Sequence, residues 1–285
     1  MAKSSLGLEI PAFGAPAALE AVALGATRIE LNAEGSYGEG GLTPSLEDLK
    51  QFTSTATRRP PLRLMIRPRG PPISSTSSQA DVASKRDFLY SHEEFAEMEA
   101  SIREFKSTGL LDASRGDGFV FGILMEDEDG EDGEGTRRKR CWVDKEKCHR
   151  LVQTAHPFKC VFHRAFDEIV SCDGITSDES AQLAWERGLQ AVADCGFDGI
   201  LTSGGLGKAV DNMEILGRII QKARTLKVEI IVGGGVRTAN VGQIVQRLGL
   251  GAQTDFIYLH SACLHGDGSE QINPEEVQGI LAHLR

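Results

Sequence analysis

Eight short runs of apolar and β-branched residues, each followed by a segment with helical spacing, constrain the fold of this chain more than any other feature. The runs are Leu6–Ile10, Arg28–Asn32, Leu62–Arg67, Gly118–Leu124, Lys159–His163, Gly199–Ser203, Val228–Val232 and Asp255–His260. Near-continuous apolar runs are typical of parallel strands buried on both faces. Eight strand–helix units within roughly 250 residues predict an α/β fold of the (β/α)₈ TIM-barrel type. A doubly wound open sheet is the alternative, because strand counts from one sequence are uncertain.

Capping signals mark the start of several intervening helices. Thr43-Pro44 has the pattern of an N-cap followed by proline at the first helical position. Ser91 and Glu94 have the spacing of a capping box, in which the two side chains bond each other's backbone N–H groups. We therefore expect helices to begin after Thr43 and after Ser91.

Two low-complexity stretches interrupt the alternation. Residues 71–86 are rich in serine and proline, and residues 126–140 run from acidic to basic. Such compositions predict mobile surface loops, so residues 1–285 are predicted to form a single barrel domain with two inserts. The basic run Arg137–Arg140 is compatible with nuclear import, although a charge run is usually a solvated surface.

Charge and cysteine usage exclude several classes of protein. The chain has 41 acidic and 31 basic residues and a net charge of −10, which argues against nucleic acid or an anionic membrane as the main partner. It lacks an apolar run of about 18 residues, so no membrane span is expected. Its six cysteines form no C-x-x-C pair. They are expected to be reduced thiols of a cytoplasmic protein.

Polar residues stand near the carboxyl ends of the predicted strands, where barrels of this kind build their sites. These residues are Glu9, Glu30, Asn32, Arg67, His163, Arg164, Asp167, Ser203 and His260. An unpaired buried carboxylate costs several kcal/mol, so Arg67 and Arg164 are expected to pair with Glu9 and Glu30. The set is interpreted either as an ionic plug that fixes the packing or as a pocket for a small charged ligand. Its origin in several different strands favours the pocket.

Four of these residues are candidates for catalysis, namely Glu9, Glu30, His163 and Asp167. A lone histidine in a strand is more often a hydrogen-bonded core residue, but His163 lies within reach of Asp167 in the sequence. The glycines Gly234 and Gly235 precede a predicted helix, where backbone N–H groups bind phosphate in many barrels. A tight turn explains them equally well.

Several motifs together resemble one family. They are Arg28–Leu31, Gly40–Ser45, Met65–Gly70, Asp87–Ser91, Phe119–Gly122, Phe162–Asp167, Leu201–Gly204 and Gly233–Gly235. In order and spacing the chain resembles the CutC family of copper-homeostasis proteins, which have a (β/α)₈ barrel. The resemblance implies copper handling in the cytoplasm, self-association into a homo-oligomer, and a polar cluster at the positions of Glu9, Glu30, Arg67, His163, Arg164, Asp167 and Ser203.

The chain departs from this family at two positions. Members proposed to bind Cu(I) carry cysteines where this chain has Pro11 and Asn32. Soft thiolates select Cu(I), so their loss removes the basis for tight cuprous binding there. His163, His260 and Cys263 remain as candidate ligands of a soft or borderline metal.

Three functions therefore stay open. The first is copper ion binding or buffering. The second is an enzyme for a small anionic or phosphorylated metabolite, with Glu9 or Glu30 as base, Arg67 and Arg164 as anion clamps and His163 as acid. The third is an inert barrel whose inserts recruit partners.

Overall fold

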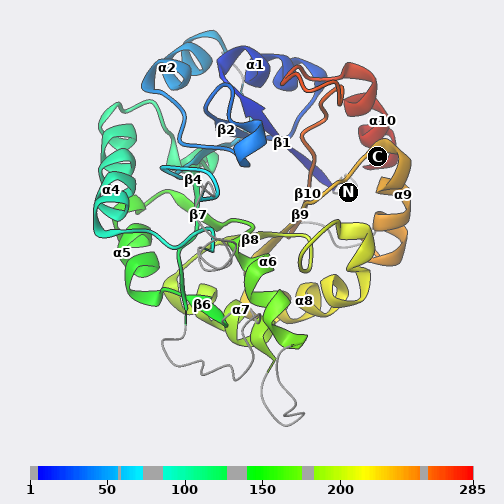
Figure 1. The fold of residues 1–285 in the computed structure, drawn as a ribbon. Helices are drawn as coiled ribbons and strands as arrows, with labels where there is room; N and C mark the ends of the chain where they lie inside the picture. Colours follow the sequence, from blue (N-terminus) through cyan, green and yellow to red (C-terminus); the bar gives the residue numbers. More distant parts are fainter. Residues whose placement is uncertain are drawn as a thin grey trace, which may run out of the picture.

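The eight apolar runs form a closed barrel of parallel strands (Figure 1). The computed structural model describes residues 6–56, 59–72, 86–126, 140–174, 183–250 and 256–284. Its barrel strands are β1 (Gly7–Phe13), β2 (Arg28–Asn32), β3 (Leu62–Met65), β4 (Gly118–Phe121), β7 (Lys159–Phe162), β8 (Gly199–Thr202), β9 (Glu229–Val232) and β10 (Ile257–His260). Each strand pairs with the next, and β10 closes on β1. The TIM-type barrel is confirmed, and the open sheet is excluded.

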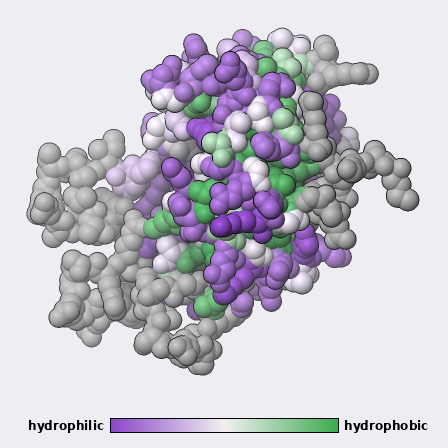
Figure 2. All heavy atoms as spheres, turned by 90° about the vertical axis from the view of Figure 1, so that its right-hand side faces the viewer, coloured by the Kyte–Doolittle hydropathy of each residue, from purple (hydrophilic) through white to green (hydrophobic). Residues whose placement is uncertain are grey.

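Helices surround the strands as an outer ring (Figure 1). They are α1 (Ala15–Leu24), α2 (Leu46–Thr55), α4 (His92–Ser107), α5 (Lys145–Ala155), α6 (Ala165–Val170), α7 (Ala184–Cys195), α8 (Met213–Leu226), α9 (Thr238–Arg247) and α10 (Pro274–Leu284). Short 3₁₀ turns cover residues 37–39, 113–115, 171–174 and 209–211. On the side where α9 and α10 lie, the surface is mostly hydrophilic with smaller hydrophobic areas (Figure 2). The apolar faces of these helices pack against the sheet.

The two predicted helix starts have different outcomes. The Ser91 capping box is confirmed, because its side chain accepts from the Glu94 N–H and Glu94 accepts from the Ser91 N–H. The prediction for Thr43-Pro44 is wrong by two residues. The N-cap is Ser45, whose side chain accepts from the Asp48 N–H at 3.0 Å. The Thr43 hydroxyl instead accepts from the Arg67 N–H at 2.8 Å and thereby joins two loops at the barrel mouth.

A short hairpin brackets the second insert. Strands β5 (Leu124–Glu126) and β6 (Cys141–Val143) pair antiparallel outside the barrel. The predicted run Gly118–Leu124 therefore ends three residues early as β4 and continues separately as β5. Residues 73–85 and 127–139, which make up most of the two inserts, lie outside the described residues. Within the described ranges, no helix combines the length and apolarity needed to cross a bilayer.

The barrel interior has an apolar side and a charged side. The apolar side chains inside the barrel are Met65, Val120, Val161, Leu201 and Ile231. The charged side comes from β1, β2 and β10. There the parallel register sets Glu9 opposite both Arg28 and His260. Because strand side chains alternate between faces, Arg28, Glu30 and Asn32 all project to the same side of β2.

Replacing Arg28 with methionine should destabilise the fold strongly. The Arg28 guanidinium is buried, donates to Glu9 and Glu229, and stacks 3.6 Å from the centre of the Tyr258 ring. Removing one partner of a buried ion pair leaves an uncompensated charge and costs about 3–5 kcal/mol. Urea unfolding followed by tryptophan fluorescence measures this loss.

Arg218→Met is the matched control. Arg218 pairs with Glu214 on the surface of α8, and both side chains are exposed. Such pairs contribute little to stability. Equal unfolding midpoints for the two variants would show that the Arg28 network does not support the barrel.

Candidate functional site

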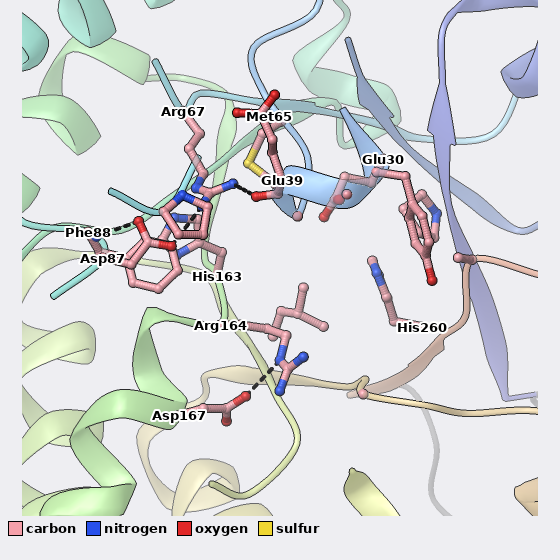
Figure 3. A pocket seen from close by; sticks show the side chains of 18 of the residues that line it. Glu30, Glu39, Met65, Arg67, Asp87, Phe88, His163, Arg164, Asp167 and His260 are labelled. Atoms are coloured by element: carbon pink, nitrogen blue, oxygen red, sulfur yellow. Dashed lines mark hydrogen bonds and ion pairs between the residues drawn. The ribbon is translucent and has the colours of Figure 1, made fainter. Parts of the chain in front are cut away.

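A cavity of about 670 Å³ opens at the carboxyl ends of the barrel strands (Figure 3). Eight of the residues that the sequence predicts for the site line this cavity. They are Glu30, Arg67, His163, Arg164, Asp167, Gly234, Gly235 and His260. Glu9, Asn32, Ser203 and Cys263 are not among the lining residues. Figure 3 shows Glu30 and His260 on one side and Arg67, Asp87, Phe88 and His163 on the other. The predicted convergence at one mouth of the barrel is therefore what the structure shows.

Glu9 lies behind the cavity and is bonded at both carboxylate oxygens. Oε2 accepts from Arg28 Nε, and Oε1 lies 2.8 Å from His260 Nδ1. Burial opposes ionisation of Glu9, but the charge of Arg28 and the bond to His260 prevail and lower its pKa to about 2. The expectation that Arg67 or Arg164 neutralises Glu9 is wrong, because the strand register provides nearer partners. Glu9 is thus a fixed anion that orients His260.

Arg67 belongs to the opposite wall of the cavity. Its Nη2 donates to Asp87 Oδ2 at 2.7 Å, and its Nη1 donates to the carbonyls of Glu39 and Gly41. β3 ends at Met65, so Arg67 stands in the loop and reaches across the mouth rather than down to Glu30. The expected Glu30–Arg67 pairing is therefore also wrong.

Arg164 and Asp167 organise the loop after β8. Arg164 Nε donates to Asp167 Oδ2 at 2.8 Å, and Nη2 donates to Ser203 Oγ at 2.9 Å. Asp167 also accepts from Thr202 Oγ1 at 2.5 Å and from the Ser203 N–H at 3.0 Å. Because its oxygens are occupied by these donors, Asp167 is placed to position the loop rather than to exchange a proton with a ligand.

Glu30 is a buried carboxylate of the cavity with spare hydrogen-bonding capacity. Its Oε1 accepts from Asn32 Nδ2 at 3.2 Å, whereas Oε2 has no partner among the described residues. Burial, opposed by the charge of His260 and reinforced by that of Glu9, raises the pKa of Glu30. A carboxyl group with a raised pKa inside a cavity is suited to proton transfer.

His163 presents a neutral imidazole to the same cavity. Its Nδ1 accepts from the Ala165 N–H at 3.3 Å, so the neutral ring carries its proton on Nε2. This Nε2 has no partner within the described part of the chain. Burial and then the charge of Arg67 lower the pKa of His163 to about 3. His163 is accordingly a hydrogen-bond donor at neutral pH and a poor general acid.

The glycine turn after β9 brings backbone close to the cavity. Gly234 has φ of +91°, and a Cβ there would lie 2.6 Å from the Ser203 Cβ. The neighbouring helix end is partly occupied, because the Thr238 N–H donates to Glu276 Oε1 at 2.8 Å. Arg237, which lines the cavity, makes no ion pair with any described residue. Arg67, by contrast, is paired with Asp87.

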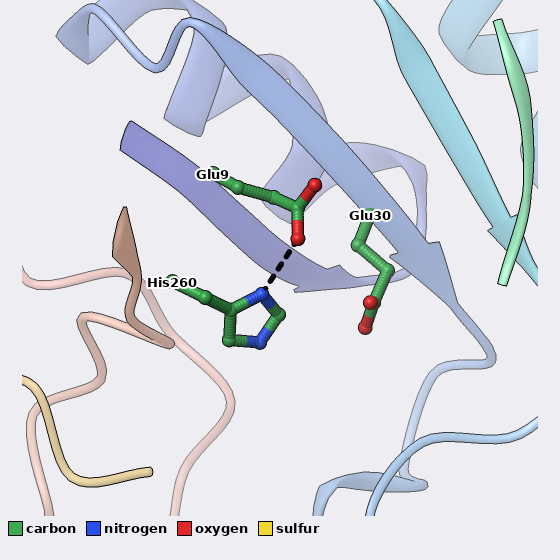
Figure 4. Close-up of side chains that lie close together, drawn as sticks. All are labelled: Glu9, Glu30 and His260. Carbon is green, nitrogen blue, oxygen red and sulfur yellow. Dashed lines mark hydrogen bonds and ion pairs between the residues drawn. The ribbon is translucent and has the colours of Figure 1, made fainter. Parts of the chain in front are cut away.

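One group of side chains has the spacing of a metal site. In the described ranges, ligand atoms of Glu9, Glu30 and His260 lie within 4.8 Å of one another (Figure 4). The predicted set of His163, His260 and Cys263 does not come together. Cys263 is buried, and burial raises its pKa to about 11. Pro11, at a position where the resemblance places a cysteine, lines the cavity, and no described cysteine does.

Sequence reasoning missed Arg28, Asp87 and Arg237 as site residues. The sequence could have indicated Arg28. It stands two residues before Glu30 and four before Asn32, and side chains two residues apart in a strand point to the same face. Asp87 lies after the first insert, and its approach to Arg67 depends on a loop path that local patterns do not specify.

Fold and site together define a parallel eight-stranded barrel protein with a charged cavity at its mouth. The chain belongs to the CutC family, whose model matches residues 8–260. It is 32% identical to a human protein named copper homeostasis protein cutC homolog, over 79% of this chain and 63% of that protein. A CutC family protein of Parabacteroides distasonis is 31% identical over 85% of this chain and 79% of that protein.

A solved structure supports the fold independently. The chain superposes with a TM-score of 0.64 on a copper homeostasis protein CutC from Streptococcus agalactiae. The identity is 22%, and the match covers 90% of this chain and 98% of the other.

Glu9→Gln should lower the pKa of His260. In the folded protein, burial lowers this pKa, but the bond to Glu9 and the charge of Glu30 outweigh it and raise the pKa above its usual value. The resulting stabilisation is present below about pH 6.5 and is lost as the pH rises through the folded-state pKa. NMR titration of the imidazole protons measures both effects.

His163 serves as the internal reference in the same titration. Its signals should stay those of a neutral ring in both proteins until the pH approaches 3. An unchanged His260 pKa in the variant, or titration of His163 near neutrality, would contradict the assigned network.

Proposed function

We propose that this protein acts in copper homeostasis, the role for which its relatives are named, and that the cavity at the barrel mouth holds its ligand. The observation that carries the proposal is the group formed by Glu9, Glu30 and His260. We also propose a cytoplasmic location, since all six cysteines are free thiols and such thiols persist in reducing compartments. Self-association, the single domain over 1–285 and nuclear import through Arg137–Arg140 remain predictions.

The donor set of this group suits Cu(II) better than Cu(I). Glu9 fixes His260 through Nδ1, which leaves Nε2 of the ring to coordinate a metal ion. Glu30 adds an unpartnered carboxylate oxygen. Imidazole and carboxylate donors bind Cu(II), whereas Cu(I) prefers sulfur. Copper bound at this place would therefore be held by Glu30 and His260.

Glu30→Gln and His260→Gln should each weaken Cu(II) binding by at least about tenfold, because each removes a donor. Binding should also weaken as the pH falls through the raised pKa of His260, since the proton competes with the metal. Isothermal titration with Cu(II) in a weakly chelating buffer measures the affinity. Glu39→Gln is the control, because Glu39 lines the cavity outside the group. Equal affinities in all four proteins would overturn the assignment.

A second function is favoured by a different observation. Glu30 and His163 line the same cavity, and the buried atoms Glu30 Oε2 and His163 Nε2 have no partner in the described structure. Together with Arg164 and Arg237, they provide a proton acceptor, a neutral donor and two cations. This combination supports acid–base chemistry on a small anionic or phosphorylated metabolite. Glu30 would act as base, and Arg237 would replace Arg67 as an anion clamp.

Arg237→Gln should weaken the binding of inorganic phosphate by about tenfold or more, because a charge-assisted hydrogen bond contributes roughly 1.5–3 kcal/mol. Isothermal titration at low ionic strength measures the affinity, with Arg218→Gln on the surface of α8 as control. The absence of phosphate binding, or equal affinity in the three proteins, would contradict the enzyme proposal and leave the copper proposal untouched.

A further inference from the structure

Two cysteine thiols that are 31 residues apart in the sequence are in contact. Cys141 opens β6, and Cys172 lies in the 3₁₀ turn that follows α6. Their Sγ atoms are 3.8 Å apart, and both side chains are buried. In the described structure no other two cysteine sulfurs are paired; the thiols of Cys148 and Cys195, for example, face backbone carbonyls. The contact is therefore a distinct feature of this pair.

A guanidinium group accompanies the two sulfurs. Arg86 Nη1 lies 3.2 Å from the Cys141 Sγ and 2.8 Å from Glu168 Oε2. Arg86 Nε donates to Glu126 Oε1 at 2.8 Å, and the Cys172 Sγ lies 3.4 Å from the Glu168 carbonyl oxygen. Arg86 thus provides a buried positive charge beside the pair, shared with two carboxylates.

The distance between the sulfurs is compatible with a bridging metal. The two atoms are in non-bonded contact as reduced thiols, since a disulfide would place them about 2.05 Å apart. Two metal–thiolate bonds of about 2.3 Å span roughly 3.8 Å at a tetrahedral angle and roughly 4.6 Å when collinear. The observed 3.8 Å already lies at the edge of this range.

We propose that Cys141 and Cys172 bind one cuprous ion as a dithiolate, with the Arg86 guanidinium beside the Cys141 sulfur. Two thiols and one Cu(I) give a complex of charge −1 and release two protons to solvent, with no change in oxidation state. Sulfur donors are those that select Cu(I). The site lies apart from Glu30 and His260. The choice of copper rests on the function proposed above, whereas the thiol pair stands on its own geometry.

Arg86 and Glu168 also line the cavity, so the pair lies just behind its wall.

Anaerobic titration of the reduced full chain with Cu(I), in competition with bathocuproine disulfonate, tests the site. The wild type should bind one Cu(I), and the double variant Cys141→Ser/Cys172→Ser should lose at least about hundredfold in affinity, because both donors are gone. Cys160→Ser is the matched control, since Cys160 is equally buried but touches no other thiol. It should bind as the wild type does.

A second measurement needs no variant and so is independent of any folding defect. X-ray absorption of the wild type with one equivalent of Cu(I) should show two sulfur neighbours. A first shell of nitrogen and oxygen only would overturn the proposal, as would unchanged Cu(I) affinity in a folded double variant. Failure to bind Cu(I), with a Cys141–Cys172 cross-link formed in air and detected by mass spectrometry, would overturn it in favour of a disulfide pair.

The variants also separate this site from the cavity. Glu30→Gln and His260→Gln should retain Cu(I) binding, because they leave both sulfurs in place. Loss of Cu(I) in these two variants, with retention in the cysteine double variant, would assign the cuprous ion to the cavity and overturn the dithiolate. Loss of Cu(II) alone in Glu30→Gln and His260→Gln bears on the proposed function and not on this inference.

Discussion

The ion pair between Glu9 and Arg28 is the interaction on which the charged half of the barrel depends. Both groups are buried inside the barrel, where an unpaired charge would be severely destabilising. Arg28 extends the network to Glu229, and Glu9 extends it to His260. Arg28 thus holds the Glu9 carboxylate, and Glu9 in turn orients the imidazole of His260.

The two walls of the cavity differ in how far their polar groups are satisfied. On one side, Arg67 is held by Asp87 and by backbone carbonyls, and Asp167 is surrounded by donors. These groups shape the mouth. On the other side, Glu30 Oε2 has no partner among the residues that the structure describes. Burial of such groups is unfavourable without a compensating bond, so their presence in a cavity points to a ligand that supplies it.

Two regions of this protein offer donor atoms of different character. The barrel mouth offers oxygen and imidazole nitrogen, in keeping with proline and asparagine where the family resemblance places cysteines. Sulfur donors are instead paired outside the barrel, at Cys141 and Cys172. Hard or borderline donors and soft donors prefer different oxidation states of copper. A protein with both could discriminate Cu(II) from Cu(I) by location.

The eight-stranded barrel, its strand positions and the convergence of Glu30, Arg67 and His163 at one mouth follow from the sequence alone. Apolar periodicity depends on local spacing, and all parallel strands of a barrel direct their carboxyl ends to the same face. The ion-pair partner of each charged side chain could not be predicted from the sequence. Strand register assigned Arg28 to Glu9, and loop paths brought Asp87 to Arg67 and Cys141 to Cys172. Such contacts join residues far apart in the chain, so only the tertiary structure decided them.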